Sequence, residues 1–207
     1  MNLFEACKQG DIQRVKLLIE KGVDIEVRDE DGSTPLIYSS LYGQIEVAKL
    51  LIEKGADIEA RDEDGSTPLM YFSHNDCLDV TKYLIEKGAD IEAKDRFGST
   101  PLIYSSNNGC LDVTKYLIEK GADIEAKDRF GWTPLMRSSI NIRLDVTKFL
   151  IEKGADFEAK NNSGKKIIDY FGEAQRKEID EFIKEIDEFI KDIQSRKAMI
   201  KPCRKMR

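Results

Sequence analysis

The chain has 207 residues, of which 41% are hydrophobic and 35% charged, and its formal net charge is −6 at pH 7. This hydrophobic content argues against an intrinsically disordered chain, and no apolar stretch approaches the roughly 20 residues that a membrane-spanning helix needs. The acidic balance disfavours nucleic acid or an anionic membrane as a partner for the body of the chain.

A fixed period of 33 residues runs along most of the chain. The triplet Thr-Pro-Leu recurs at Thr34, Thr67, Thr100 and Thr133. A glycine recurs at Gly22, Gly55, Gly88, Gly121 and Gly154. Such a period is typical of stacked repeats, in which each unit buries its apolar face only against its neighbours. The period therefore predicts an elongated array with an extended recognition surface rather than a catalytic pocket.

One unit, residues 64–96, shows which elements each repeat should contain. Thr67 can cap a short helix that begins at Pro68, and a second helix should start near Leu78 and end at Gly88. The buried stripe of this second helix comprises Val80, Leu84 and Ile85. Residues 89–93 are expected to run extended into the next turn. The unit is therefore predicted to be helix, turn, helix and hairpin-like loop.

The Thr-Pro-Leu triplets, together with segments such as Lys54-Gly55-Ala56-Asp57-Ile58-Glu59, make residues 1–190 resemble the ankyrin-repeat family. The resemblance implies an all-α ankyrin-repeat solenoid with four full units at 31–63, 64–96, 97–129 and 130–162. Residues 1–30 resemble an N-terminal capping repeat, whose inward side chains are Leu3, Phe4, Val15, Leu17 and Leu18. Residues 163–193 resemble a degenerate C-terminal capping repeat, and 194–207 form a basic tail.

The chain departs from the family pattern at several columns of equivalent positions. Where the family usually has histidine after Thr-Pro-Leu, this chain has Ile37, Met70, Ile103 and Met136, so contact between helices should depend more on apolar packing. The family's paired small residues are kept as serines except at Phe72. A glutamate column (26, 59, 92, 125, 158) and a lysine column (21, 54, 87, 120, 153) are expected to be solvated, with each pair contributing under ~1 kcal/mol.

A second, shorter repeat of seven residues occupies 177–193. The letters KEIDEFI run from Lys177 and again from Lys184, and isoleucines at 179, 183, 186, 190 and 193 form a heptad seam. The first heptad should cover the last repeat, whereas the second extends beyond what one repeat can bury. Two interpretations remain open: an elongated cap that lies back on the array of a monomer, or a helix for self-association or for recruiting a second protein.

The resemblance implies that loop tips and first helices form a concave recognition face, and the tips change along the array. Early tips are acidic (Glu30-Asp31, Glu63-Asp64), and later tips pair arginine with phenylalanine. Arginine and large aromatic residues dominate binding hot spots. We therefore predict a contact patch for a protein partner at Arg96, Phe97, Arg129, Phe130 and Trp132. Its floor would be Tyr71, Tyr104 and Arg137. An acidic partner segment with apolar anchors would match the late tips, and a basic one the early tips.

Catalysis, metals and cofactors find no support in the sequence. The single histidine, His74, lies in a repeat loop and leaves no good base for a nucleophile. The four cysteines (Cys7, Cys77, Cys110, Cys203) contain no C-x-x-C pair, and with one histidine they cannot supply a zinc set. We therefore expect a non-enzyme with reduced thiols in the cytoplasm or nucleus. A weaker alternative function is contact of the basic tail with nucleic acid or membrane.

Overall fold

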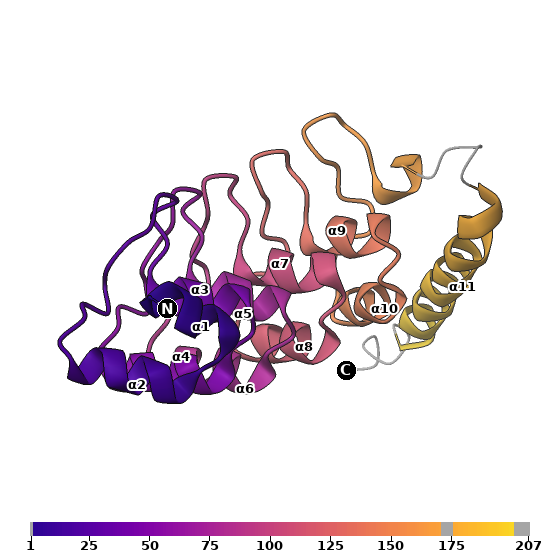
Figure 1. Ribbon diagram of the computed structural model, residues 1–207. Helices are drawn as coiled ribbons and strands as arrows, with labels where there is room; N and C mark the ends of the chain where they lie inside the picture. Colours follow the sequence, from indigo (N-terminus) through magenta and orange to yellow (C-terminus); the bar gives the residue numbers. More distant parts are fainter. Residues whose placement is uncertain (1, 171–175, 201–207) are drawn as a thin grey trace.

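The computed structural model describes residues 2–170 and 176–200, although the side chains of 168, 170, 176–183 and 197–200 lie outside the description. Within these ranges the chain is helical and contains no strand. Five helix pairs stack side by side into an elongated array, and a long helix crosses its C-terminal end (Figure 1). The pairs are α1 (Leu3–Gln9) with α2 (Ile12–Glu20), α3 (Pro35–Leu41) with α4 (Ile45–Glu53), α5 (Pro68–His74) with α6 (Leu78–Glu86), α7 (Pro101–Asn108) with α8 (Leu111–Glu119), and α9 (Pro134–Ile140) with α10 (Leu144–Glu152). The 3-10 helix η1 (Ile167–Tyr170) and the long helix α11 (Arg176–Ile200) follow.

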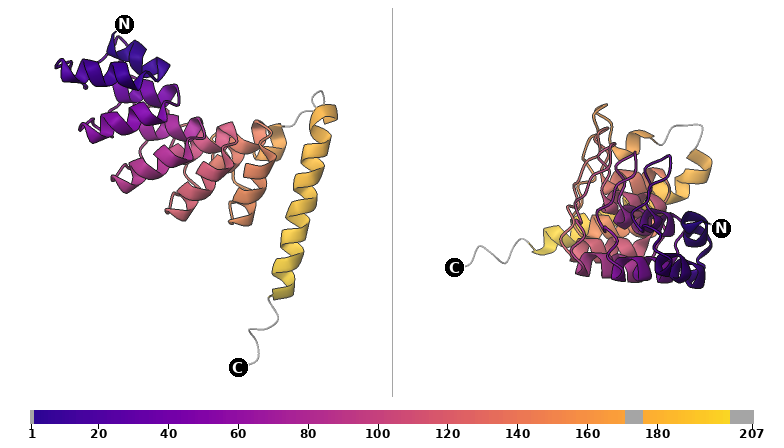
Figure 2. Two further views of the ribbon diagram at one scale, coloured as in Figure 1. Left: turned by 60° about the horizontal axis from the view of Figure 1, so that its bottom comes forward. Right: turned by 60° about the vertical axis from the view of Figure 1, so that its left-hand side comes forward.

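The first helices form one row, the second helices form another, and the loops that join successive pairs rise above both rows (Figure 1). Figure 2 shows the same two rows from other sides, with α11 running across the end of the stack. The observed helices begin at Pro68 and near Leu78 in the second unit, as the sequence predicts. The Thr67 hydroxyl, which was predicted to cap the first of them, has no hydrogen-bond partner, whereas the hydroxyls of Thr34, Thr100 and Thr133 accept the N–H three residues on. The positions of the unit boundaries themselves stay a prediction.

The second helices end at a glycine because the chain must turn through a left-handed conformation there. Gly88 has φ 95°, and its N–H donates to the Ile85 carbonyl at 3.0 Å. The N–H of Ala89 then donates to the Leu84 carbonyl at 3.0 Å. These two bonds satisfy carbonyls at the end of α6 that would otherwise lack a partner.

The segment after this glycine differs from the expected extended conformation. Residues 90–93 form a turn, in which the Ala93 N–H donates to the Asp90 carbonyl at 3.2 Å. The Asp90 side chain also accepts the Glu92 N–H at 2.9 Å. The extended prediction was wrong because an aspartate that bonds its own backbone two residues on stabilises a turn.

The core follows the predicted stripes with one exception. Val80 and Leu84 of α6 are fully buried, and Ile37, Met70, Ile103 and Met136 all lie in the interior of the first-helix row. In the N-terminal pair, Leu3 and Val15 are buried, but Leu17 is 38% exposed. The prediction that Leu17 faces inward was wrong, since α2 has a neighbouring second helix on only one side.

Helix α11 covers the C-terminal end of the core with its second heptad. Ile186 is buried in a cluster with Val146, Leu150 and Ile151, and Phe189, Ile190 and Ile193 pack against the same cluster. A salt bridge of 2.8 Å joins Lys148 of α10 to Glu185 of α11. The expectation that the second heptad extends past the buried surface was therefore wrong. The side chains of Ile179, Phe182 and Ile183 in the first heptad lie outside the description.

Candidate partner-binding surface

The loop tips form a continuous row because the backbone of each tip bonds to the next. The N–H of Arg96 donates to the Asp64 carbonyl at 2.7 Å, and the N–H of Arg129 donates to the Phe97 carbonyl at 2.7 Å. The row continues in the same way from Asn162 to Phe130, at 3.0 Å. These bonds fix the spacing of the tips from one repeat to the next, so the tip side chains project from a rigid edge.

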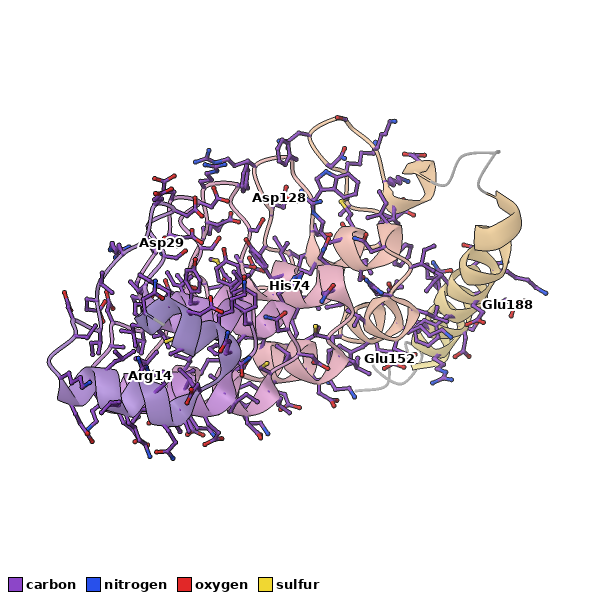
Figure 3. All side chains as sticks on the ribbon, viewed as in Figure 1. Arg14, Asp29, His74, Asp128, Glu152 and Glu188 are labelled. Atoms are coloured by element: carbon purple, nitrogen blue, oxygen red, sulfur yellow. The ribbon has the colours of Figure 1, made fainter. Side chains whose placement is uncertain are left out.

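An aspartate shapes each tip from within, and the aspartates of the two late tips, Asp95 and Asp128, are buried. One carboxylate oxygen of Asp95 accepts the N–H groups of Phe97 and Ser99 at 2.8 and 2.7 Å. Asp128 accepts the N–H groups of Phe130 and Trp132 at 2.8 and 2.9 Å. Figure 3 labels Asp29 and Asp128 among these loops, above the first helices. The sequence reasoning missed these aspartates, although their recurrence at 29, 62, 95 and 128 was a signal for them.

The predicted floor residues bond to the same aspartates. The Tyr71 hydroxyl donates to Asp62 at 2.6 Å, and the Tyr104 hydroxyl donates to Asp95 at 2.9 Å. Arg137 takes the same place in the fourth unit and pairs with Asp128. Burial raises the pKa of Tyr104, and the neighbouring Asp95 raises it further. These three side chains therefore tie the loops to the first helices, whatever else they contact.

Two grooves lie between the tips and the first helices, and they divide the predicted patch. The late groove, of about 280 Å³, has Phe97, Phe130, Tyr104 and Arg137 in its wall. The rest of its lining is His74, Asp95, Ser99, Ile103 and Asn107. The early groove, of about 320 Å³, contains Tyr71. Its other lining residues are Asp31, Ser33, Leu41, Asp62, Glu63 and Asp64. Tyr71 thus lies apart from the other floor residues, in an acidic groove.

The five tip residues of the predicted patch differ in how free their side chains are. Phe97 and Phe130 are 40% and 55% exposed. Arg96 lies over the Phe97 ring at 4.8 Å and pairs with Asp64 at 2.8 Å. Arg129 is exposed.

Trp132, the fifth of these residues, is only partly exposed, and Arg137 lies 5.1 Å from the centre of its ring. It is absent from the lining of the late groove. Trp132 therefore does not line the groove itself but supports Arg137, which does.

The glutamate column lies on the loops but is not a passive solvated ladder. Glu59 accepts the N–H of Asp90 in the next unit at 2.8 Å. The same bond recurs from Glu26, Glu92 and Glu125 at 2.7–2.9 Å. The expectation of solvated pairs was wrong for these glutamates, because each supplies an acceptor to a backbone N–H one repeat away. Lys87, Lys120 and Lys153 of the neighbouring lysine column lie over aromatic rings of the helices they follow, as Lys120 does over Tyr116 at 5.3 Å.

Burial shifts the pKa of the single histidine and of the two buried cysteines among the described residues. Burial lowers the pKa of His74, whose ring meets the Tyr104 ring edge-on at 6.3 Å. Burial raises the pKa of the Cys7 thiol to about 12 and that of Cys110 to about 11. Thiolates, the reactive form, are therefore disfavoured at both positions.

The described residues contain no group of three or more His, Cys, Asp or Glu side chains that could hold a metal ion. None of the helices in the described part of the chain is both long enough and apolar enough to span a membrane.

Stacked helix pairs with a rigid row of loop tips define a repeat solenoid, a class whose extended concave surfaces are used for binding. A family model described as ankyrin repeats (3 copies) matches residues 3–95 and 92–161 of this chain. The chain therefore belongs to the ankyrin-repeat family. Ankyrin repeats generally mediate protein–protein interaction, and the family is typically non-enzymatic.

Proposed function

We propose that this protein is a non-enzymatic interaction module that binds a partner protein on its concave face, through the late loop tips and the late groove. The single observation that carries the proposal is the pair of exposed phenylalanine rings, Phe97 and Phe130, on backbones fixed by inter-repeat hydrogen bonds. Apolar side chains held in place before binding lose little conformational entropy when a partner covers them. Arg96, Arg129, Trp132, Tyr104 and Arg137 complete the proposed surface, and Tyr71 would contact a partner that extends into the early groove.

A capture experiment with matched variants tests this surface. The intact chain and the Phe97→Ala/Phe130→Ala variant would be immobilised in parallel, and captured proteins compared by quantitative mass spectrometry. Leu17→Ala is the control, because it removes an exposed apolar side chain from α2, in the other helix row. The affinity of a specific partner should fall at least tenfold in the double variant, about 1.4 kcal/mol, and stay unchanged in the control. Equal capture by all three chains would refute the proposed surface.

The adaptor alternative, in which residues 177–193 recruit a second protein or a second copy, has less support. The apolar side of the second heptad is already covered by α10, since Ile186 is buried there. Its exposed side carries Lys184 and Glu188, which form an ion pair at 3.9 Å. Truncation after Ile183 tests this alternative: loss of an oligomer or of a second partner, with binding to the array retained, would favour the adaptor.

Contact of the basic tail with nucleic acid or membrane is the weakest alternative. Arg196, the first cation of the tail, lies on α11 and pairs with Asp192 at 2.6 Å. Residues 201–207 lie outside the described residues. Binding to nucleic acid that falls steeply with salt, and that disappears without residues 194–207, is what this alternative requires. An intracellular location, cytoplasmic or nuclear, stays a prediction from the sequence.

A further inference from the structure

We propose that the late groove accepts one large apolar side chain from an acidic, extended segment of the partner. This inference rests on the proposed function, because it specifies what the same surface recognises. The occupant is defined by two features, the apolar anchor and the flanking carboxylates, and each corresponds to a separate property of the late tips.

The size of the groove suits a single anchor side chain. Its volume is about 280 Å³, whereas sites for drug-sized ligands start at about 300 Å³ and an engineered cavity of about 150 Å³ already binds benzene. The rings of Phe97 and Phe130 border it, and Ile103 adds an aliphatic surface. A leucine or phenylalanine side chain would therefore be buried against apolar atoms on several sides.

The charged groups that line the groove are already paired, so they do not demand a charged ligand. The Asp95 carboxylate accepts three hydrogen bonds, two from backbone N–H groups and one from Tyr104. Arg137 is engaged by the buried carboxylate of Asp128. Burial also lowers the pKa of His74, which favours its neutral form. An apolar anchor can thus enter without leaving a buried charge unpaired.

The flanks of the groove are cationic. Arg129 is exposed beside Phe130, and no ion pair is found for it among the described residues. Arg143 is exposed, and its Nε donates to the carbonyl of Asn107, a lining residue of the groove, at 3.4 Å. Arg96 adds a third cation, although it shares its charge with Asp64. Carboxylates on either side of the anchor would therefore meet positive charge.

The charge reverses toward the N-terminal end of the array, which limits where an acidic segment can lie. Glu30, Asp31 and Glu63 are exposed on the early tips, and Asp31 and Glu63 line the early groove. An acidic segment is repelled there and attracted to the late tips. The charge pattern thus selects the late groove over the early groove, which has a similar volume.

Three synthetic 11-residue peptides test the inference on the intact chain. The first has a central leucine flanked on each side by glutamates, the second replaces the glutamates by lysines, and the third replaces the leucine by serine. Trp132 is the only tryptophan in the chain, and it stacks on Arg137 in the groove wall. Its fluorescence therefore reports occupancy of the groove without a label.

The acidic leucine peptide should bind at least tenfold more tightly than either other peptide. Phe130→Ala should weaken it about tenfold, and Arg129→Glu should weaken it about fivefold while improving the lysine peptide. Leu17→Ala should change neither affinity. Equal affinity for the acidic and basic peptides, or no binding of any peptide, would overturn the inference. So would a dimer of the intact chain that disappears in Phe130→Ala, since a second copy would then occupy the groove.

The outcome also separates this inference from the proposed function. If captured partners depend on Phe97 and Phe130 but the acidic peptide does not bind, the surface stands and its assigned chemistry fails. If captured partners ignore both phenylalanines, the proposed function itself fails.

Discussion

The second unit contains a buried threonine hydroxyl, that of Thr81, whose equivalents in the third and fourth units are hydrogen-bonded. In the third unit, the Thr114 hydroxyl donates to the Ser105 hydroxyl at 2.9 Å and joins the two helices of the pair. The equivalent Thr81 is buried, but its hydroxyl has no hydrogen-bond partner. The cause is Phe72, which stands where the third unit has Ser105. Thr81→Val and Thr114→Val therefore make the same chemical change in two different surroundings.

The expected effects have opposite signs. Thr114→Val removes a hydrogen bond between two buried groups and should lower the free energy of unfolding by about 1 kcal/mol. Thr81→Val removes a hydroxyl whose desolvation is uncompensated and should raise the free energy of unfolding by about 1 kcal/mol. Valine and threonine have nearly equal helix propensity, so propensity cancels. A difference of about 2 kcal/mol corresponds to roughly 4–8 °C in Tm for a chain of this size.

The free energy of unfolding of both variants is measured by thermal and urea unfolding, with the helical circular dichroism signal as the probe. Thr147→Val is the matched control, because the Thr147 hydroxyl donates to Ser138 at 3.0 Å, in the same way as in the third unit. It should behave as Thr114→Val does. If Thr81→Val lowers the free energy of unfolding as much as Thr114→Val and Thr147→Val do, then Phe72 does not leave the Thr81 hydroxyl without a hydrogen-bond partner, and the reasoning is refuted.

Three further predictions concern the backbone, the glutamate column and a buried thiol. Ile142→Gly should stabilise the fold by about 1 kcal/mol, because Ile142 holds φ 57° where Gly109 stands one unit earlier; a lower urea midpoint would contradict this. Glu59→Ala should cost about 1 kcal/mol, whereas Glu59→Gln keeps an acceptor oxygen for the Asp90 N–H and should cost less; equal losses in thermal melts would count against the bond. Cys7, whose pKa is about 12, should react with iodoacetamide at pH 8.5 only after unfolding, as site-resolved mass spectrometry can show. Because this folded pKa lies above the unfolded value of about 8.5, the stability that the thiol contributes is complete below that value and is lost as pH rises toward 12.

The helices could be predicted from the sequence because their signals are local. The threonine cap and the proline at the first helical position act within a few residues, and so does the glycine that ends each second helix. The 33-residue period then predicted where the helices of the later units begin, once one unit had been interpreted. Two of the wrong expectations, an extended segment at 89–93 and an inward Leu17, arose where a side chain bonds the backbone or where a helix lacks a neighbour on one side.

The contacts between repeats could not be predicted in the same way, because they depend on how far one unit is staggered against the next. Glu59 and Asp90 are 31 residues apart, and only the stacked structure shows that the carboxylate reaches the N–H. The heptad of α11 poses the same difficulty. Two identical heptads offer the same apolar side chains, and only the structure shows that those of the second heptad contact α10.

The near-identity of the units makes their differences informative, and two differences in the fourth unit are linked. Arg137 replaces the tyrosine found at 38, 71 and 104, and Trp132 replaces serine. Their side chains stack on each other, and Arg137 keeps the bond to the buried aspartate that the tyrosines make. The contact with Arg137 therefore explains Trp132 as a part of the repeat scaffold. Phe130 has a backbone that holds the tip row and a ring that is 55% exposed. Recognition should accordingly depend more on the phenylalanine than on the tryptophan, although the tryptophan is the rarer residue.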